Sequence, residues 1–179
     1  QVDVSSAVLK AKQSNGDALL VYTNEEESAR ALRELRKQGY PRPVVGETVL
    51  TSQKVIELAG DAANGVRGHV GRTVDAPVAP VLAVRERFCK RHKYLPDHNG
   101  LKGYTGVYAV KYATEKAGKF DRKLLAKTMH GLTIKPEQEP GILMEATWDD
   151  KGDIDRISFL AEVVNGQQKV VQILPKLGK

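Results

Sequence analysis

Four aspartates toward the C-terminal end form one group of possible metal ligands in the sequence. Asp149, Asp150, Asp153 and Asp155 carry oxygen ligands of the kind that calcium prefers. Their spacing, the position of the nearby glycine and the lack of a terminal glutamate do not fit a calcium-binding loop. We therefore predict a polar turn between two strands at this position.

Cys89, His92 and His98 form a second candidate metal site, because zinc prefers thiolate and imidazole ligands. No further Cys-x-x-Cys or His-x-x-x-His pair completes a set of four ligands. Cys89 is also the sole cysteine, which excludes an internal disulfide. We predict neither a metal nor any other cofactor.

Catalytic motifs are missing from the sequence. Acid–base catalysis requires paired carboxylates or a histidine within reach of a nucleophile, and neither arrangement is visible. The Gly-x-Gly-x-x-Gly, phosphate-loop and Gly-x-Ser-x-Gly motifs are absent as well. We therefore do not expect an enzyme.

The remaining candidates are polar and aromatic residues at the ends of predicted strands. They are Tyr22, Asn24, Glu47 and Thr48, together with Asn99 in a predicted loop at 98–100. A carboxylate at such a place could hold an ammonium group, and a tyrosine could supply an apolar wall with a polar tip. Structural roles are open to them too, because Asn24 suits a helix cap and Glu47 suits an exposed acid in a first helical turn.

The pattern of apolar residues predicts the elements that position these side chains. Residues 18–22 (ALLVY) form a continuous apolar run, which is typical of a strand buried on both faces in a parallel sheet. A helix follows, in which Asn24 and Glu27 form a capping box. A short strand at 44–45 and a helix from Thr51 or Ser52 to Ala59 complete the pattern.

Strands and helices that alternate at these lengths predict an α/β fold with right-handed crossovers and a doubly wound parallel sheet. Ligands of such sheets bind beyond the carboxyl ends of the strands. In this sequence those ends are residues 22–24 and 46–48.

The sequence changes character after a further strand predicted at 66–70. Residues 72–80 (RTVDAPVAP) contain two prolines and indicate a connector. We then predict helices at 81–92, 104–116 and 121–130, a strand at 142–148, and a hairpin of residues 157–164 and 169–174. Asp121 is expected to cap the last of these helices, and Asp3 or Ser5 to cap a first helix near the N-terminus.

Composition narrows the function classes. The chain has 179 residues, 41% of them hydrophobic, and a formal net charge of +6, a balance that invites a nucleic-acid partner. Nucleic-acid binding requires clustered basic residues. The basic residues here are spread along predicted helices and mixed with acids, as in EEESARALRELRK, so we expect no nucleic-acid partner. No apolar run is long enough to span a membrane, and the first residues lack the pattern of a signal peptide.

Four segments carry a resemblance to a known family. They are DALLVYTNEEESARALRELRKQGY, PVVGETVLTSQKVIELAGDAANGV, KGYTGVYAVKYATEKAG and WDDKGDIDRISFLAEVVNGQ. In order and spacing they are similar to the branched-chain amino-acid (Leu/Ile/Val) type of extracellular solute-binding protein of ABC importers, across essentially the whole chain. The resemblance implies the type I periplasmic-binding-protein fold, in which two Rossmann-like lobes are joined by three crossings and close on a small ligand.

The resemblance also implies a division of the chain. Residues 1–70 and the C-terminal hairpin 157–179 fall in the second lobe, and residues 71–156, helices plus a strand, belong to the first. Family members carry roughly a full first lobe before the corresponding starting point, so the fold is expected to be incomplete, with its N-terminal lobe missing. We expect the missing N-terminal half or a second copy of the chain to cover the apolar faces of 71–156.

The implied function is capture without chemistry. The resemblance makes the chain part of the substrate-binding component of an ABC importer, which takes a branched-chain amino acid or a related small carboxylate into an interlobe cleft and delivers it to a membrane permease. It implies a periplasmic or extracellular location, with or without a lipid anchor, and a signal segment that is not in this chain. A ligand-sensing regulatory domain of the same fold is the alternative.

The candidate residues take roles from the same comparison. Tyr22 to Asn24 fall where the family often offers an aromatic wall to the ligand. Glu47 and Thr48 fall where amino-acid binders place the acid that holds the ammonium group, with Thr48 nearer that position. Asn99 falls in a loop that approaches the cleft in the family.

Overall fold

The computed structural model describes residues 3–178, which divide into two compact units. The first unit contains the chain up to Gly71 together with Phe159–Gln172. The second unit contains Arg72–Ser158 and the chain from Ile173 onward. Among the described residues, no helix combines the length and the apolar character that crossing a membrane requires.

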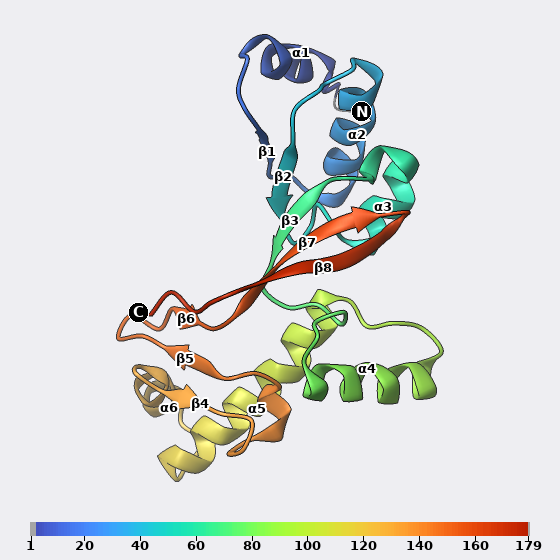
Figure 1. The fold of residues 1–179 in the computed structure, drawn as a ribbon. Coiled ribbons are helices and arrows are strands. Elements are labelled where there is room, and N and C mark those ends of the chain that lie inside the picture. Colours follow the sequence, from blue (N-terminus) through green and yellow to red (C-terminus); the bar gives the residue numbers. More distant parts are fainter. Residues whose placement is uncertain (1–2, 179) are drawn as a thin grey trace. The chain divides into compact units, whose positions relative to one another are not determined.

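A five-stranded sheet forms the centre of the first unit (Figure 1). Its first three strands run parallel, and the fourth pairs antiparallel with the third. In spatial order the strands are β1 (Leu19–Val21), β2 (Val44–Glu47), β3 (Arg67–Val70), β7 (Ser158–Val164) and β8 (Gln167–Leu174).

Three α-helices build the core of the first unit with this sheet. They are α1 (Ser5–Gln13), α2 (Glu25–Lys37) and α3 (Gln53–Ala59), and the short 3-10 helix η1 (Gly60–Ala63) continues α3. The strand residues Val21 and Val44 are buried together with Leu32 of α2 and Val55 of α3. Burial of these apolar side chains is the main force that holds helices and sheet together.

The other face of the same sheet is only partly covered. Leu20 is 68% exposed, and its register partner Val45 is half-buried. Next to them, Arg67 Nε and Glu162 Oε2 form an ion pair at 2.7 Å between register partners on β3 and β7. The prediction that 18–22 is buried on both faces is therefore wrong for the described residues, because every second side chain of β1 and β2 points to this open face.

Helix caps in the first unit follow the sequence in part. Ser52 accepts a hydrogen bond from the Val55 N–H at 3.3 Å, as predicted for the start of α3. Asn24 stands at the N-cap of α2, but its side chain makes no capping hydrogen bond, so the predicted capping box does not form. The first turn of α2 is instead held by the Ser28 N–H, which donates to the Asn24 carbonyl at 2.8 Å.

Two glycines bring the start of α3 onto the sheet. Gly46 and Gly68 are register partners on β2 and β3. A Cβ atom at Gly46 would lie 2.5 Å from Leu50 Cδ2, and one at Gly68 would lie 2.9 Å from Thr51 Cγ2. The loop that carries Thr48 can lie directly against the strands because both positions lack a side chain.

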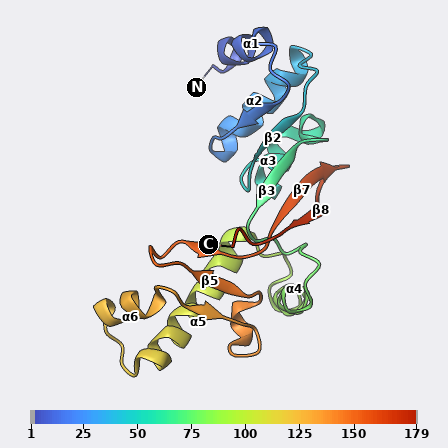
Figure 2. The ribbon, with the colours of Figure 1, turned by 60° about the vertical axis from the view of Figure 1, so that its left-hand side comes forward.

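The hairpin of β7 and β8 forms where the sequence predicts it (Figure 2). Asn165 and Gly166 have φ of 51° and 71°, the left-handed conformation that a two-residue hairpin turn requires. Asn64 Oδ1 accepts a hydrogen bond from the Gly166 N–H at 2.9 Å.

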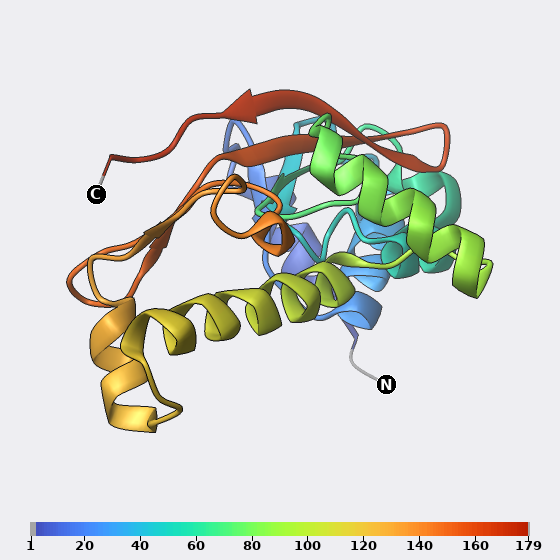
Figure 3. The same ribbon diagram turned by 90° about the horizontal axis from the view of Figure 1, so that it is seen from below.

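The second unit is mainly helical. It contains α4 (Ala79–His92), α5 (His98–Ala117) and α6 (Arg122–Met129), and α6 packs beside α5 (Figure 3). A small antiparallel sheet of β4 (Thr133–Ile134), β5 (Ala146–Trp148) and β6 (Ile154–Asp155) completes it. Ala113 of α5, Ile134 of β4 and Ile142 are fully buried in its core.

Two boundaries in the second unit differ from the prediction. Helix α5 begins at His98 rather than Tyr104, because Asp97 caps it by accepting the Gly100 N–H at 2.7 Å. The predicted strand 142–148 shortens to β5, because the 3-10 helix η2 (Pro140–Ile142) and the positive φ of Leu143 (65°) break the extended run. Asp121 caps α6 as predicted, accepting the Leu124 N–H at 2.8 Å.

Candidate functional site

The carboxyl ends of β1, β2 and β3 meet at one edge of the parallel sheet (Figure 1). Polar side chains follow two of these ends directly. Four of the five residues predicted from the sequence lie here, namely Tyr22, Asn24, Glu47 and Thr48.

The segment after β1 presents two of these side chains to solvent. Tyr22 is 75% exposed, and Asn24 is exposed as well. Between them, the backbone is held by Ser28, whose hydroxyl donates to the Thr23 carbonyl at 3.2 Å and lies 2.8 Å from Thr23 Oγ1. A fixed turn thus presents an aromatic ring and an amide to solvent. The ring could serve as an apolar wall and the amide as a hydrogen-bonding group.

The segment after β2 orients a carboxylate. Glu47 Oε1 accepts the Val49 N–H at 3.0 Å, so the side chain is tied to its own loop. Thr48 is nearly buried, and its hydroxyl donates to the His69 carbonyl at 3.3 Å. Thr48 therefore anchors the loop to β3, while the half-buried Glu47 offers its charge at the surface.

His69 is a residue at this edge that the sequence interpretation did not select as a site residue. It is the register partner of Glu47 on β3, and its side chain is exposed. Cross-strand partners in one register point to the same face of a sheet, so an imidazole stands beside the carboxylate. The signal that could have found it is the parallel alignment of 44–47 with 66–70, which pairs the two positions.

Asn99 lies elsewhere. It is exposed in the first turn of α5, in the second unit, and not in a loop as predicted. Its neighbour Asp97 is the residue that makes the capping hydrogen bond. The ligand-binding role of Asn99 remains a prediction, as does that of the four residues at the sheet edge.

The two groups of possible metal ligands have structural roles. Asp149 Oδ1 accepts the N–H groups of Lys151 and Asp153 at 2.9 and 2.8 Å, and the bond from Asp153 is the main reason that the pKa of Asp149 is lowered. The ring of His92 packs against that of Phe88 in a tilted arrangement, with ring centroids 4.5 Å apart, and Cys89 Sγ donates to the Tyr94 carbonyl. Among residues 3–178, no cluster of histidine, cysteine, aspartate or glutamate could hold a metal ion.

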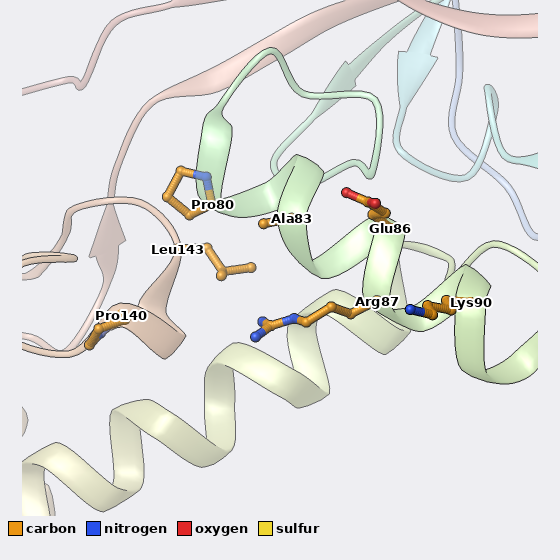
Figure 4. Close-up of a pocket in the computed structure, with 7 residues that line it drawn as sticks. All are labelled: Pro80, Ala83, Glu86, Arg87, Lys90, Pro140 and Leu143. Carbon is orange, nitrogen blue, oxygen red and sulfur yellow. The ribbon is translucent and has the colours of Figure 1, made fainter.

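A hollow of about 430 Å³ opens in the second unit between α4 and η2 (Figure 4). Side chains of α4 face the η2 segment across it, and the charged ones are of both signs. Such a mixed lining favours no single class of ligand. Its lining residues, none of which is a predicted site residue, are Pro80, Ala83, Glu86, Arg87, Lys90, Pro140 and Leu143.

Comparison with protein-family models assigns the chain to a family. The model of the periplasmic binding protein family matches residues 1–168. The chain belongs to this family. The periplasmic binding protein also resembles Leu/Ile/Val-binding protein homolog 1 of Brucella abortus, with 25% identity over 156 residues that make up 84% of this chain and 39% of that protein.

Solved structures share the fold of this periplasmic binding protein. A leucine-binding protein from Thermotoga maritima superposes with a TM-score of 0.83 at 21% identity, covering 98% of this chain and 49% of that one. A solute-binding protein of an ABC transporter from R. palustris, solved with benzoate, gives a TM-score of 0.79 at 16% identity, covering 100% and 49%.

These comparisons confirm the α/β fold class and the family resemblance predicted from the sequence. The chain spans about half the length of the solved structures named here, and less than half of the Brucella protein.

Proposed function

We propose that this periplasmic binding protein contributes to the substrate-binding component of an ABC importer and captures a small solute at the carboxyl edge of its parallel sheet. The observation that carries the proposal is the set of polar side chains from Tyr22 to Asn24 and at Glu47 and Thr48, which a buried core positions at one edge. Family membership supports it, as do similar proteins whose names include leucine binding and whose complexes include benzoate. Capture of this kind is binding without covalent chemistry, so the protein is not an enzyme.

The ligand class is a branched-chain amino acid or a related small carboxylate. The bond from the Val49 N–H holds one oxygen of Glu47, which orients the other oxygen toward a ligand ammonium group. Tyr22 supplies an apolar surface for the ligand side chain. The amide of Asn24, which does not cap α2, and the amide of Asn99 offer further hydrogen bonds.

The proposal includes partners beyond the described residues. Residues 1–70 and 157–179 belong to one lobe and 71–156 to the other, and the N-terminal half of the protein or a second copy of the chain completes the cleft. Closure on the ligand creates the form that docks on a membrane permease, because a ligand that contacts both lobes favours the closed state. The site of action is then periplasmic or extracellular.

A thermal-shift screen tests the proposed function on this chain and on the longest polypeptide that its gene encodes. The panel contains leucine, isoleucine, valine and benzoate. A ligand at a hundred times its dissociation constant adds about 2.7 kcal/mol to the free energy of unfolding, which the screen resolves. If none of these compounds changes the melting temperature of either polypeptide, the proposed function is wrong.

Variants at the sheet edge test the assigned roles. Glu47→Gln should weaken binding of an amino acid by at least about 1 kcal/mol, because a charged hydrogen-bond partner is lost, and should leave benzoate unaffected. Tyr22→Ala should weaken both ligands, while its exposed position predicts a change in unfolding free energy within about 0.5 kcal/mol. Glu57→Gln on α3, where the carboxylate contacts Gln53, is the matched control. Equal affinities in Glu47→Gln and Glu57→Gln would remove Glu47 from the site.

A further inference from the structure

Charge is distributed unevenly between the two units. The second unit holds 18 of the 28 lysines and arginines and 12 of the 22 acids. The first unit holds the remaining 10 of each kind, so the whole formal net charge of +6 lies in the second unit. The even mixing of cations and acids in EEESARALRELRK therefore describes the first unit. A positive surface on one unit favours a negatively charged partner at that unit.

The joint between α5 and α6 concentrates part of this charge. Residues 116–123 (KAGKFDRK), which we call the basic tip, contain four cations and one acid. Figure 1 shows the yellow end of α5, where the basic tip begins, at an outer edge of the second unit. All four cations are exposed, and among residues 3–178 none of them forms an ion pair. They are Lys116, Lys119, Arg122 and Lys123.

An aromatic side chain stands in the middle of the basic tip. Phe120 is 80% exposed, a larger fraction than that of any other large hydrophobic residue among residues 3–178. A phenyl ring in water is unfavourable, because its apolar surface stays hydrated. A ring flanked by cations suits a boundary at which apolar and charged groups both find partners, such as the surface of a lipid bilayer.

The backbone of the basic tip is fixed without these side chains. Gly118 ends α5 in the left-handed conformation, with φ of 77°, and its N–H donates to the Thr114 carbonyl at 3.0 Å. Asp121, the single acid, begins α6 by accepting the Leu124 N–H at 2.8 Å. The cations and Phe120 are not needed to end one helix or to begin the next. They can therefore be replaced without unfolding the joint.

We propose that the basic tip is a membrane-contact surface that binds a bilayer of anionic lipids. Clusters of four or more lysines and arginines are typical of segments that bind anionic headgroups. Phe120 would enter the boundary between the headgroups and the acyl chains. An acidic polypeptide or a nucleic acid would also attract the cations, but it would not require an exposed ring between them. The exposure of Phe120 thus favours lipid as the partner.

Vesicle co-sedimentation of this chain tests the proposal. One set of vesicles contains phosphatidylcholine alone, and the other contains equal parts of phosphatidylcholine and anionic phosphatidylglycerol. The wild type should bind the anionic vesicles preferentially, and added salt should weaken this binding because salt screens the charges. The triple variant Lys119→Gln/Arg122→Gln/Lys123→Gln should bind about 100-fold more weakly, since each cation contributes about fivefold. Phe120→Ser should weaken binding by about fivefold or more.

Two matched controls separate the basic tip from general effects. The triple variant Lys10→Gln/Arg33→Gln/Lys54→Gln removes the same charge from exposed cations of the first unit. Val107→Ser removes an exposed apolar side chain from α5 itself, about three turns before that helix ends. Both controls should bind the anionic vesicles as the wild type does.

Three outcomes would overturn the proposal. The wild type could bind both kinds of vesicle equally, or the two triple variants could lose binding equally, in which case net charge and not the basic tip governs binding. Phe120→Ser could bind as tightly as the wild type, which would assign the cations to an acidic polypeptide or a nucleic acid. None of these measurements involves a solute, so they leave the proposed capture function to its own test.

Discussion

Polar side chains at the sheet edge of the first unit are used differently from two carboxylates of the second unit. At the sheet edge of the first unit, Tyr22, Asn24 and Glu47 are exposed or half-buried, and few of their polar atoms are used internally. In the second unit, Glu139 is buried against Lys111 at 2.7 Å, and Glu145 is paired with Lys176 at 2.8 Å. Polar groups left available at a sheet edge can bind a ligand, whereas groups consumed by internal pairs hold the fold together.

The comparison extends to the cores. The first unit rests on a parallel sheet whose helices α2 and α3 also pack on each other, and its buried residues come from segments far apart in the sequence. The second unit rests on the long helix α5 and on η2, which lies against it. Substitutions in one unit should therefore affect that unit first, and the sole tryptophan, Trp148 in β5, reports on the second unit alone.

The largest effect is expected from Val44→Asp in β2. Val44 is buried in the core of the first unit, so the new charge would have no partner and should cost several kcal/mol, enough to unfold this unit. Val45→Asp should cost much less, because Val45 is half-buried and is the register partner of Arg67.

Chemical denaturation followed by far-UV circular dichroism and by Trp148 fluorescence measures both variants. In Val44→Asp, the far-UV circular dichroism signal should lack the part that comes from the folded first unit. The unfolding transition seen by Trp148 fluorescence should persist. A simultaneous loss of both transitions would show that the units do not fold separately, and a more damaging Val45→Asp would contradict the assignment of the two faces.

A smaller effect is expected from Gly141→Ala in the second unit. A Cβ atom at Gly141 would collide with the ring of Tyr108 on α5, so the side chains must shift at a cost of about 1–3 kcal/mol. Gly103→Ala, on α5 itself, meets open space and should stabilise the helix by about 0.5–1 kcal/mol.

The midpoint of the Trp148 fluorescence transition gives both values. Because the two substitutions add the same methyl group, the difference between their unfolding free energies contains two contributions: the cost of the contact between η2 and α5, and the helical gain at Gly103. An unchanged midpoint in Gly141→Ala would contradict the role of the contact between η2 and α5 in the second unit.

The smallest effect is the pH dependence that Glu139 contributes. The hydrogen bond from Lys111, and then the Gly141 N–H, lower the pKa of Glu139 below 4.5. This carboxylate therefore stabilises the second unit fully above pH 4.5, and the stabilisation is lost as the pH falls through the lowered pKa.

The free energies of unfolding of the wild type and of Glu139→Gln should differ above pH 4.5, the ordinary value for a glutamate, and should converge at lower pH. Trp148 fluorescence, recorded between about pH 7 and pH 2, measures both proteins. Glu115→Gln is the control, because Glu115 is an exposed partner of the same lysine at 3.4 Å. A pH profile of Glu139→Gln that runs parallel to the wild type would exclude this role.

The sequence predicted the elements of the first unit well, because their signals are local. Strand β2, helix α3 with its Ser52 cap and the Asn165–Gly166 turn each depend on a few consecutive residues. The exposure of Leu20 could not be predicted in this way, since an apolar run gives no information about which neighbours are present to cover it. The start of α5 was missed because Asn99 and Gly100 favour loops, and the Asp97 cap outweighed that preference.

The positions of the candidate site residues could be predicted where those residues lie at the ends of strands. Tyr22 and Glu47 stand out because each ends an apolar run, and parallel strands bring such ends to one edge. His69 required the register of β2 and β3, which depends on long-range pairing. The burial of Arg72, which is only 6% exposed, could not be predicted from the sequence, where a single arginine in a connector looks like any surface residue.

The close approach of Gly46 and Gly68 to Leu50 and Thr51 sets a rule for variation in this chain. Any side chain at either glycine would have to displace the loop that carries Thr48, so mutational libraries should recover only glycine at both positions. The adjacent positions on the open face, such as the half-buried Val45 and the exposed His69, already carry side chains and should accept a wider range of residues. The sheet thus separates, residue by residue along the same strands, positions that are fixed by shape from positions that are free to diversify.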